Sequence, residues 1–515
     1  MNSGLGANRS PSDPSPLPPH QLPILVEKLA KENWEDAASL IEQHWDDLAA
    51  THPGHLLDAI GALPGAALIE RPTLMVAANY LQHVVNGSSP GRFDDDGWVN
   101  TSQTGLGVSL IDTLTLSTAK SAGARTTGDM PGARRSAEEA RAALDSAPAP
   151  ERAAIKSSLP HLRLQWGRSL ELADAPGSAL EYEEAYETAI LTKQTAVARR
   201  AAAHHAWMDA ERGRLNSAEQ WVSRAHDTNA TNTRYDAVIS LTASLLRLDR
   251  GDRVGATREL GRSNGFGDGE YWAAALWVQS MIANDSASAA LVDSRLAHQL
   301  TRHPDSLSNT GANGRYIRAA GARLSGFRGR PAGISAVDPG LSSTDKAAAG
   351  VFAHARGNYH EALNIVRMIV EPEEHPRTQS IALLVTAAAA VNLGQNETAA
   401  AAFAQAHALL NHERLYTPYE CIPWPDLEHL TAITGLELPN VESPFRLKKN
   451  HFAILSKREL EILRLLAQGK TPTETAQILF VAPNTVKSTT RRLYRKLDVN
   501  SRSSAIDRAR QSGLL

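Results

Sequence analysis

A row of polar and cationic residues near the carboxyl end is the part of the sequence best suited to bind a partner through hydrogen bonds and charge. Asn484, Lys487, Ser488, Arg491 and Arg495 follow one another at three- or four-residue spacing, which places them on one face of a helix. A helix fits the major groove of B-DNA, where Lys and Arg side chains donate to guanine acceptors. The spacing therefore predicts a recognition helix that reads base edges.

The segments before this row carry the local signals that start and stop helices. Ser456 with Glu459, and Thr471 with Glu474, each form a capping-box pattern, and Gly469 between them predicts the end of the first helix. Pro472 occupies a first helical position, where its missing N–H costs nothing. We therefore expect two helices joined by a turn, a third helix over residues 484–497, and a fourth that begins at Ser501.

The whole carboxyl-terminal segment resembles the LuxR/FixJ-type DNA-binding domain, a four-helix helix-turn-helix fold. The residues that carry the resemblance are Leu455, Arg458, Glu459, Leu460, Leu463, Leu466, Gly469, Glu474, Ala476, Leu479, Thr485, Val486, Lys487, Tyr494, Arg495, Lys496, Leu497, Val499 and Arg502. The resemblance implies a bacterial transcription regulator that binds double-stranded DNA, usually as a homodimer, with a dimer contact supplied by the last helix.

The expected DNA contacts fall into two groups. The base-reading residues are Asn484, Lys487, Ser488 and Arg491. The phosphate-contacting residues are Thr471, Thr485, Arg492, Arg495, Lys496 and Arg502. Three positions depart from the family pattern: Ala482 replaces a Ser cap, Thr475 an apolar residue, and Thr489 a frequent His. None of these departures removes a positive charge from the reading face.

The distribution of charge agrees with a nucleic-acid partner for the tail alone. The formal net charge is −3, yet residues 446–515 contain 15 Lys and Arg against 5 Asp and Glu, and residues 1–445 contain 38 against 51. A helical bundle with a solvated basic face would also be cationic. It would not account for two consecutive capping boxes separated by a turn.

A local repeat indicates the architecture of the middle of the chain. Gly is followed five residues later by Ala in the pairs Gly213/Ala218, Gly251/Ala256, Gly357/Ala362 and Gly394/Ala399, with periods of 38 and 37 residues within the two sets. Gly can close the turn between paired helices, and Ala lets helix backbones approach closely. Together with Ala206, Ala225, Ala387, Phe403 and Ala406, the pattern resembles tetratricopeptide repeats.

The composition and the helix-breaking residues indicate the fold class and the expected division of the chain into segments. Hydrophobic residues make up 42% and aromatic residues 5% of the chain, and the abundance of Ala, Leu, Glu and Arg favours an all-α fold. The expected segments are a disordered leader over 1–23, a helical region over 24–130, tetratricopeptide-like repeats over 131–413, a proline-rich linker over 414–450 and the DNA-binding domain over 451–515.

Other classes of function are not supported by the sequence. Cys421 is the single cysteine, and neither a signal sequence nor a membrane-length apolar run is present, so we expect a cytoplasmic protein. No phosphate-binding loop, receiver-domain pattern, metal-ligand spacing or nucleophile elbow is found, so we expect no enzyme activity, cofactor or metal. Two hypotheses stay open: a regulator whose helices respond to a protein or small-molecule effector, and an interaction scaffold with secondary DNA binding.

Overall fold

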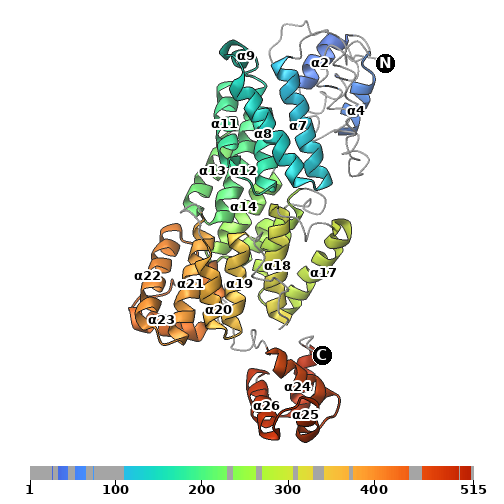
Figure 1. Ribbon diagram of the computed structural model, residues 1–515. Helices are drawn as coiled ribbons and strands as arrows, with labels where there is room; N and C mark the ends of the chain where they lie inside the picture. The colour runs from blue at the N-terminus through green and yellow to red at the C-terminus, as the bar shows by residue number, and fades with distance from the viewer. Residues whose placement is uncertain are drawn as a thin grey trace, which may run out of the picture. The chain divides into compact units, whose positions relative to one another are not determined.

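The computed structural model describes residues 26, 33–43, 53–64, 74, 109–228, 236–262, 270–304, 311–328, 342–369, 375–439, 455–497 and 499–511 (Figure 1). All regular elements in these residues are helices, so the prediction of an all-α fold is confirmed there. The predicted leader over 1–23 lies outside the described residues. The chain divides into two compact units, one formed by residues 1–127 and 138–155, the other by residues 128–137 and 156–515.

The first unit contains a small helical core of its own. Its described helices are α2 (Trp34–Gln43), α4 (Pro53–Gly61), α7 (Leu110–Thr127), α9 (Ala149–Ala154) and the later part of α8 (Met130–Ser146). Asn33 Oδ1 accepts from the N–H of Asp36 at 3.4 Å, which caps α2. Ala37, Ala38 and Ile41 are fully buried and form the apolar face of this helix.

The second unit is built mainly from pairs of adjacent helices, each joined by a short turn. The pairs are α10 (Leu159–Leu172) with α11 (Ser178–Leu191), α12 (Thr195–Arg212) with α13 (Leu215–Asp227), α14 (Asp236–Asp249) with α15 (Arg253–Gly261), α16 (Trp272–Ile282) with α17 (Ser286–Arg302), α19 (Ser343–Ala355) with α20 (Tyr359–Arg367), and α21 (Pro376–Asn392) with α22 (Asn396–Glu413). The helix α18 (Ala312–Arg328) packs on α16 and α19.

The Gly/Ala pattern has the structural role that the sequence indicates. Gly213, Gly251, Gly357 and Gly394 all have positive φ, between 75° and 91°, in the turns of four helix pairs. The four alanines that follow, Ala218, Ala256, Ala362 and Ala399, have no exposed surface. Paired-helix repeats are therefore observed, whereas membership of the tetratricopeptide family stays a prediction.

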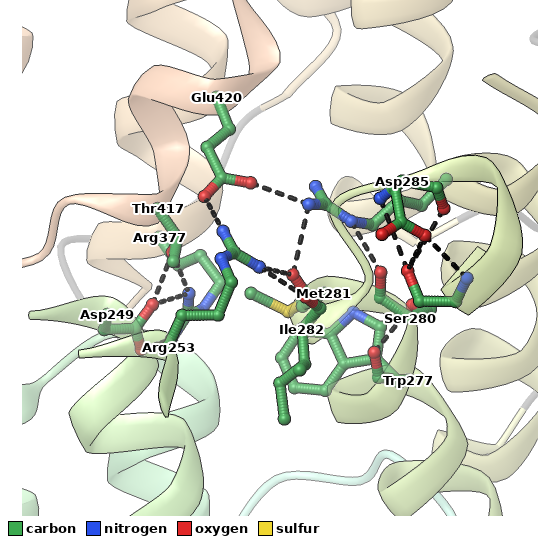
Figure 2. Close-up of polar contacts among 12 residues, drawn as sticks. Asp249, Arg253, Trp277, Ser280, Met281, Ile282, Asp285, Arg377, Thr417 and Glu420 are labelled. Carbon is green, nitrogen blue, oxygen red and sulfur yellow. Dashed lines mark hydrogen bonds and ion pairs between the residues drawn. The ribbon is translucent and has the colours of Figure 1, made fainter. Parts of the chain in front are cut away.

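Helices far apart in the sequence also meet within this unit, and buried ion pairs join them. Arg377 in α21 donates to both carboxylate oxygens of Asp249 in α14, at 2.8 and 2.5 Å (Figure 2). It also donates to the carbonyls of Ala210 and Glu211 in α12, each at 2.8 Å. Asp249 has no exposed surface, so this pairing supplies the partner that a buried carboxylate requires.

The structure differs from the predicted linker over residues 414–439. This segment contains the 3-10 helix η4 (Thr417–Cys421) and the helix α23 (Trp424–Thr434), which packs on α21 and α22. Leu427 and Leu430 belong to the main core, at 1% and 0% exposure. Pro418 and Pro425 stand at the starts of these helical turns, where no N–H is needed, and Pro423 is the residue that precedes α23. Pro439 lies in non-helical chain after α23. Residues 440–450 lie outside the described ranges.

A glutamate within η4 joins this segment to α15 and α18. Glu420 accepts from Arg253 at 2.5 Å and from Arg323 at 2.6 Å (Figure 2). The same two guanidinium groups donate to the carbonyls of Ser280, Met281 and Ile282, where α16 ends. Carbonyls in the last turn of a helix lack partners within the helix, so these arginines satisfy them.

Candidate nucleic-acid interface

Four helices form the carboxyl-terminal domain: α24 (Lys457–Ala467), α25 (Pro472–Ile478), α26 (Pro483–Leu497) and α27 (Arg502–Gln511). Two small apolar clusters hold them together. One contains Leu455, Leu463, Leu493, Leu497, Ala505 and Ala509, and the other Ile462, Leu466, Ala476 and Val486. Both clusters include residues of α24 and α26, so the core fixes the third helix against the first.

Both predicted capping boxes are present. The hydroxyl of Ser456 accepts from the N–H of Glu459 at 3.2 Å, and Glu459 Oε2 accepts from the N–H of Ser456 at 2.7 Å. Thr471 and Glu474 form the same reciprocal pair at 3.3 and 2.8 Å. Hydrogen bonds from Thr471 hold the pKa of Glu474 below its ordinary value. The two boxes start α24 and α25 where the sequence places them.

The turns around α25 use left-handed backbone. Gly469 has φ of 89° and follows α24, as the sequence predicts. Phe480 has φ of 54° in the turn between α25 and α26, and its side chain is 96% exposed. Left-handed conformation is rare for a bulky residue, and no signal in the sequence indicates it at this position. The turn directs the chain from α25 into α26.

The helix α26 has a buried face and an exposed polar face. Val486, Thr489, Leu493 and Leu497 are buried at three- and four-residue spacing. All four predicted base-reading residues, Asn484, Lys487, Ser488 and Arg491, are exposed. The Ser488 hydroxyl donates to the carbonyl of Thr485 at 3.0 Å. The arrangement presents a cationic, hydrogen-bonding surface that can enter a DNA groove.

The predicted phosphate-contacting residues fall into two groups in the structure. Thr471, Thr485, Arg492 and Arg495 are exposed. Lys496 and Arg502 are half-buried and have partners inside the domain: Lys496 Nζ donates to Glu459 Oε2 at 2.7 Å, and Arg502 donates to the carbonyl of Leu466 at 2.5 Å. No local pattern indicates these two contacts, because the partners are 37 and 36 residues away in the sequence.

The last helix places its small residues inside the domain. The Ser501 hydroxyl accepts from the N–H of Ser504 at 3.1 Å and caps α27. Ala505 and Ala509 have no exposed surface and belong to the cluster with Leu463 and Leu493. The small apolar face of this helix therefore packs inside the domain and is not free to contact a second copy.

The part of the chain that the structure describes contains neither a metal-ion cluster nor a helix able to span a membrane. Within those ranges, no group of three or more His, Cys, Asp or Glu side chains has the geometry to hold a metal ion. No described helix combines the length and the apolar character that crossing a membrane requires.

Comparison with known proteins assigns this domain. Residues 453–509 match the family described as "Bacterial regulatory proteins, luxR family". Similar proteins include the probable transcriptional regulatory protein NarL of Mycobacterium tuberculosis, 44% identical over 62 residues, and the transcriptional regulatory protein LiaR of Bacillus subtilis, 44% identical over 61 residues. The oxygen regulatory protein NreC of Staphylococcus carnosus is 38% identical over 82 residues.

These matches are confined to one end of the molecule. They cover 12%, 12% and 16% of this chain, and 29%, 29% and 35% of NarL, LiaR and NreC respectively. No solved structure matches the chain. The similarity and the four-helix geometry together identify the carboxyl-terminal segment of this chain as a LuxR-family helix-turn-helix domain.

Proposed function

We propose that this chain is a sequence-specific DNA-binding transcriptional regulator in which α26 enters the major groove. One observation carries the proposal: Lys487, Ser488 and Arg491 are exposed on one face of α26, while the opposite face is buried in the domain core. The relatives named as transcriptional regulatory proteins share this domain, which supports the same use of it here.

The residues take different roles in this proposal. Asn484, Lys487, Ser488 and Arg491 read base edges, where each good bidentate contact discriminates by about 1–3 kcal/mol. Thr471, Thr485, Arg492 and Arg495 contact phosphates, which sets the register and the salt dependence of binding. The protein acts in the cytoplasm as a homodimer on DNA. Its paired helices receive a protein or small-molecule effector and have no catalytic role.

The proposal is tested by selecting bound duplexes in vitro with the full chain and then measuring affinity by fluorescence polarisation. Arg491→Ala is expected to reduce discrimination between the selected duplex and a random one more than Arg495→Ala does, because Arg491 reads bases and Arg495 contacts phosphate. A Lys487→Glu/Arg491→Glu double variant reverses two charges on the reading face. Unchanged duplex binding by this variant would refute the placement of α26 in the groove.

An interaction scaffold is the second candidate function, because pairs of helices make up most of the described chain and stacked repeats commonly offer binding surfaces. A genome-wide occupancy map separates the two functions. A regulator gives focused peaks that contain the selected motif, whereas a scaffold with secondary DNA binding gives none.

A further inference from the structure

Glu459 joins the start of α24 to the last turn of α26. Its Oε2 atom accepts from the backbone N–H of Ser456 at 2.7 Å and from Lys496 Nζ at 2.7 Å. The Glu459 side chain is 3% exposed, whereas that of Lys496 is 33% exposed. One nearly buried carboxylate oxygen therefore completes the helix cap and also binds a cation from the proposed recognition helix.

Two arginines fix α24 to other parts of the same domain. Arg502, the first residue of α27, donates to the carbonyl of Leu466 in the last turn of α24 at 2.5 Å. Arg458 in α24 donates to the carbonyl of Leu479 after α25 at 2.7 Å. Cationic side chains thus connect α24 to α26, to α27 and to Leu479, the residue that follows α25.

The burial of Glu459 decides what Lys496 can do. A carboxylate removed from water needs a partner charge, and taking that partner away is strongly unfavourable. Lys496 would leave Glu459 without its cation if the ammonium moved to a DNA phosphate. The exposed side chains of Arg492 and Arg495, by contrast, can reach phosphate without disturbing a buried group.

We propose that Lys496 and Glu459 are a positioning pair that sets the orientation of α26 on α24, and that Lys496 is not a phosphate ligand. The inference rests on the proposed function, since it concerns how the reading face is held. It also replaces the sequence-based expectation for Lys496, which considered only its position on the helix.

Salt dependence of duplex binding separates the two roles of a cation. The logarithm of affinity falls with the logarithm of salt concentration by ~0.9 for each phosphate neutralised. With the full chain and a random-sequence duplex, we expect Arg492→Met to reduce this slope by ~0.9 and Lys496→Met to leave it unchanged. A reduction of ~0.9 for Lys496→Met would overturn the proposal.

A second set of variants guards against loss of folding, because Lys496→Met leaves a buried charge unpaired. The double variant Lys496→Met/Glu459→Gln removes both charges and keeps an oxygen for the Ser456 cap, a change that proteins often tolerate. Its slope is also expected to match that of the wild type. A reduced slope in this folded variant would likewise contradict the positioning role.

Sequence discrimination provides the readout specific to positioning. The quantity measured is the ratio of affinities for the selected and the random duplex. We expect Lys496→Met and Glu459→Gln each to lower this ratio about tenfold. The double variant should lower it no further, because the effects of coupled neighbours are not additive. Lys496→Arg, which keeps the pair, should retain most of the ratio. Additive losses would overturn the proposal, whereas absence of salt-dependent binding by the wild type would overturn the proposed function itself.

Discussion

Thr475 in α25 is a buried polar residue that the domain leaves unsatisfied. Its side chain has no exposed surface, and its hydroxyl oxygen has no hydrogen-bond partner among the described residues. A buried hydroxyl without a partner keeps its full desolvation cost. This cost falls at the position where the LuxR family usually has an apolar residue.

Replacing Thr475 by the isosteric Val should therefore stabilise the domain. We expect Thr475→Val to raise the local unfolding free energy by about 1 kcal/mol, seen as roughly fivefold slower amide hydrogen exchange in α25 of the full chain. Thr473→Val is the matched control, because Thr473 lies exposed in the same helix and should change little. Equal exchange rates in the two variants would show that the Thr475 hydroxyl is satisfied.

Glu171 in α10 is a buried acid that titrates near neutral pH. Burial raises the pKa of Glu171 to about 7. Hydrogen bonds from Tyr182 at 2.5 Å and Tyr271 at 3.0 Å favour the charged form and partly oppose this rise. His204 lies 2.6 Å from the Tyr271 hydroxyl, so the carboxyl group belongs to a chain of buried polar groups. The charged state of Glu171 costs folding free energy because its folded pKa exceeds the unfolded value of 4.5.

The sign of the pH effect follows from this shift. The stabilising contribution of protonated Glu171 is complete below pH 4.5 and is lost as the pH rises through about 7. We expect Glu171→Gln to raise the melting temperature of the full chain at pH 8 but not at pH 4.5, the difference corresponding to at most about 3 kcal/mol. The control Glu187→Gln, an exposed residue of α11, should show no such dependence. A pH-independent effect of Glu171→Gln would contradict the raised pKa.

At the scale of elements, the turns between paired helices are not equivalent. Gly213 and Gly394 both have positive φ, at 91° and 75°. A Cβ atom on Gly213 would meet the backbone nitrogen of Arg377 and the side chain of Leu415, each at 2.8 Å, whereas one on Gly394 would meet nothing within 4 Å. Only the first turn is packed closely against a distant helix.

This difference gives a matched pair of substitutions. Gly394→Ala should cost about 1 kcal/mol, the strain of placing a side chain in left-handed backbone. Gly213→Ala adds a clash with backbone that cannot move freely, so we expect a clearly larger drop in melting temperature for the full chain. Equal drops would show that the contact of α12 with α21 adapts without cost.

An element can be predicted from the sequence when the interactions that form it lie within a few residues of one another. The capping boxes at Ser456 and Thr471 act within four residues, so the sequence indicates where α24 and α25 start. The pairing of Arg377 with Asp249 spans 128 residues and depends on how the helix pairs stack, which no local pattern encodes. The same holds for Lys496, whose partner lies two helices earlier.

The residues after Arg414 show the converse case, in which a local pattern has a different outcome in its tertiary context. A high density of proline predicts a linker, yet prolines at first helical positions are compatible with η4 and α23. What distinguishes the two outcomes is the burial of Leu427 and Leu430 against α21 and α22, which depends on tertiary contacts. Proline density by itself therefore does not distinguish a linker from the starts of packed helical turns.

At the scale of the whole molecule, one recognition helix limits how specifically the protein can bind. If each of the four proposed base-reading side chains contributes only about 1 kcal/mol, the lower end of its range, one domain reaches a discrimination of only about 10³. Regulators that must find one site in a genome need a ratio of about 10³–10⁷ over random DNA. Two copies of the domain on adjacent half-sites would supply it.

We therefore expect selected duplexes to contain two copies of one motif, with centres about one helical turn of DNA apart. Mass photometry of the complex should show two chains per duplex, and scrambling one half-site should lower affinity at least tenfold. Pairing through α27 cannot use Ala505 or Ala509, which the domain buries, and must use neighbours such as Ser503 or Asp507, which are exposed. A single unrepeated motif bound tightly by one chain would exclude the dimer and would require contacts outside α26.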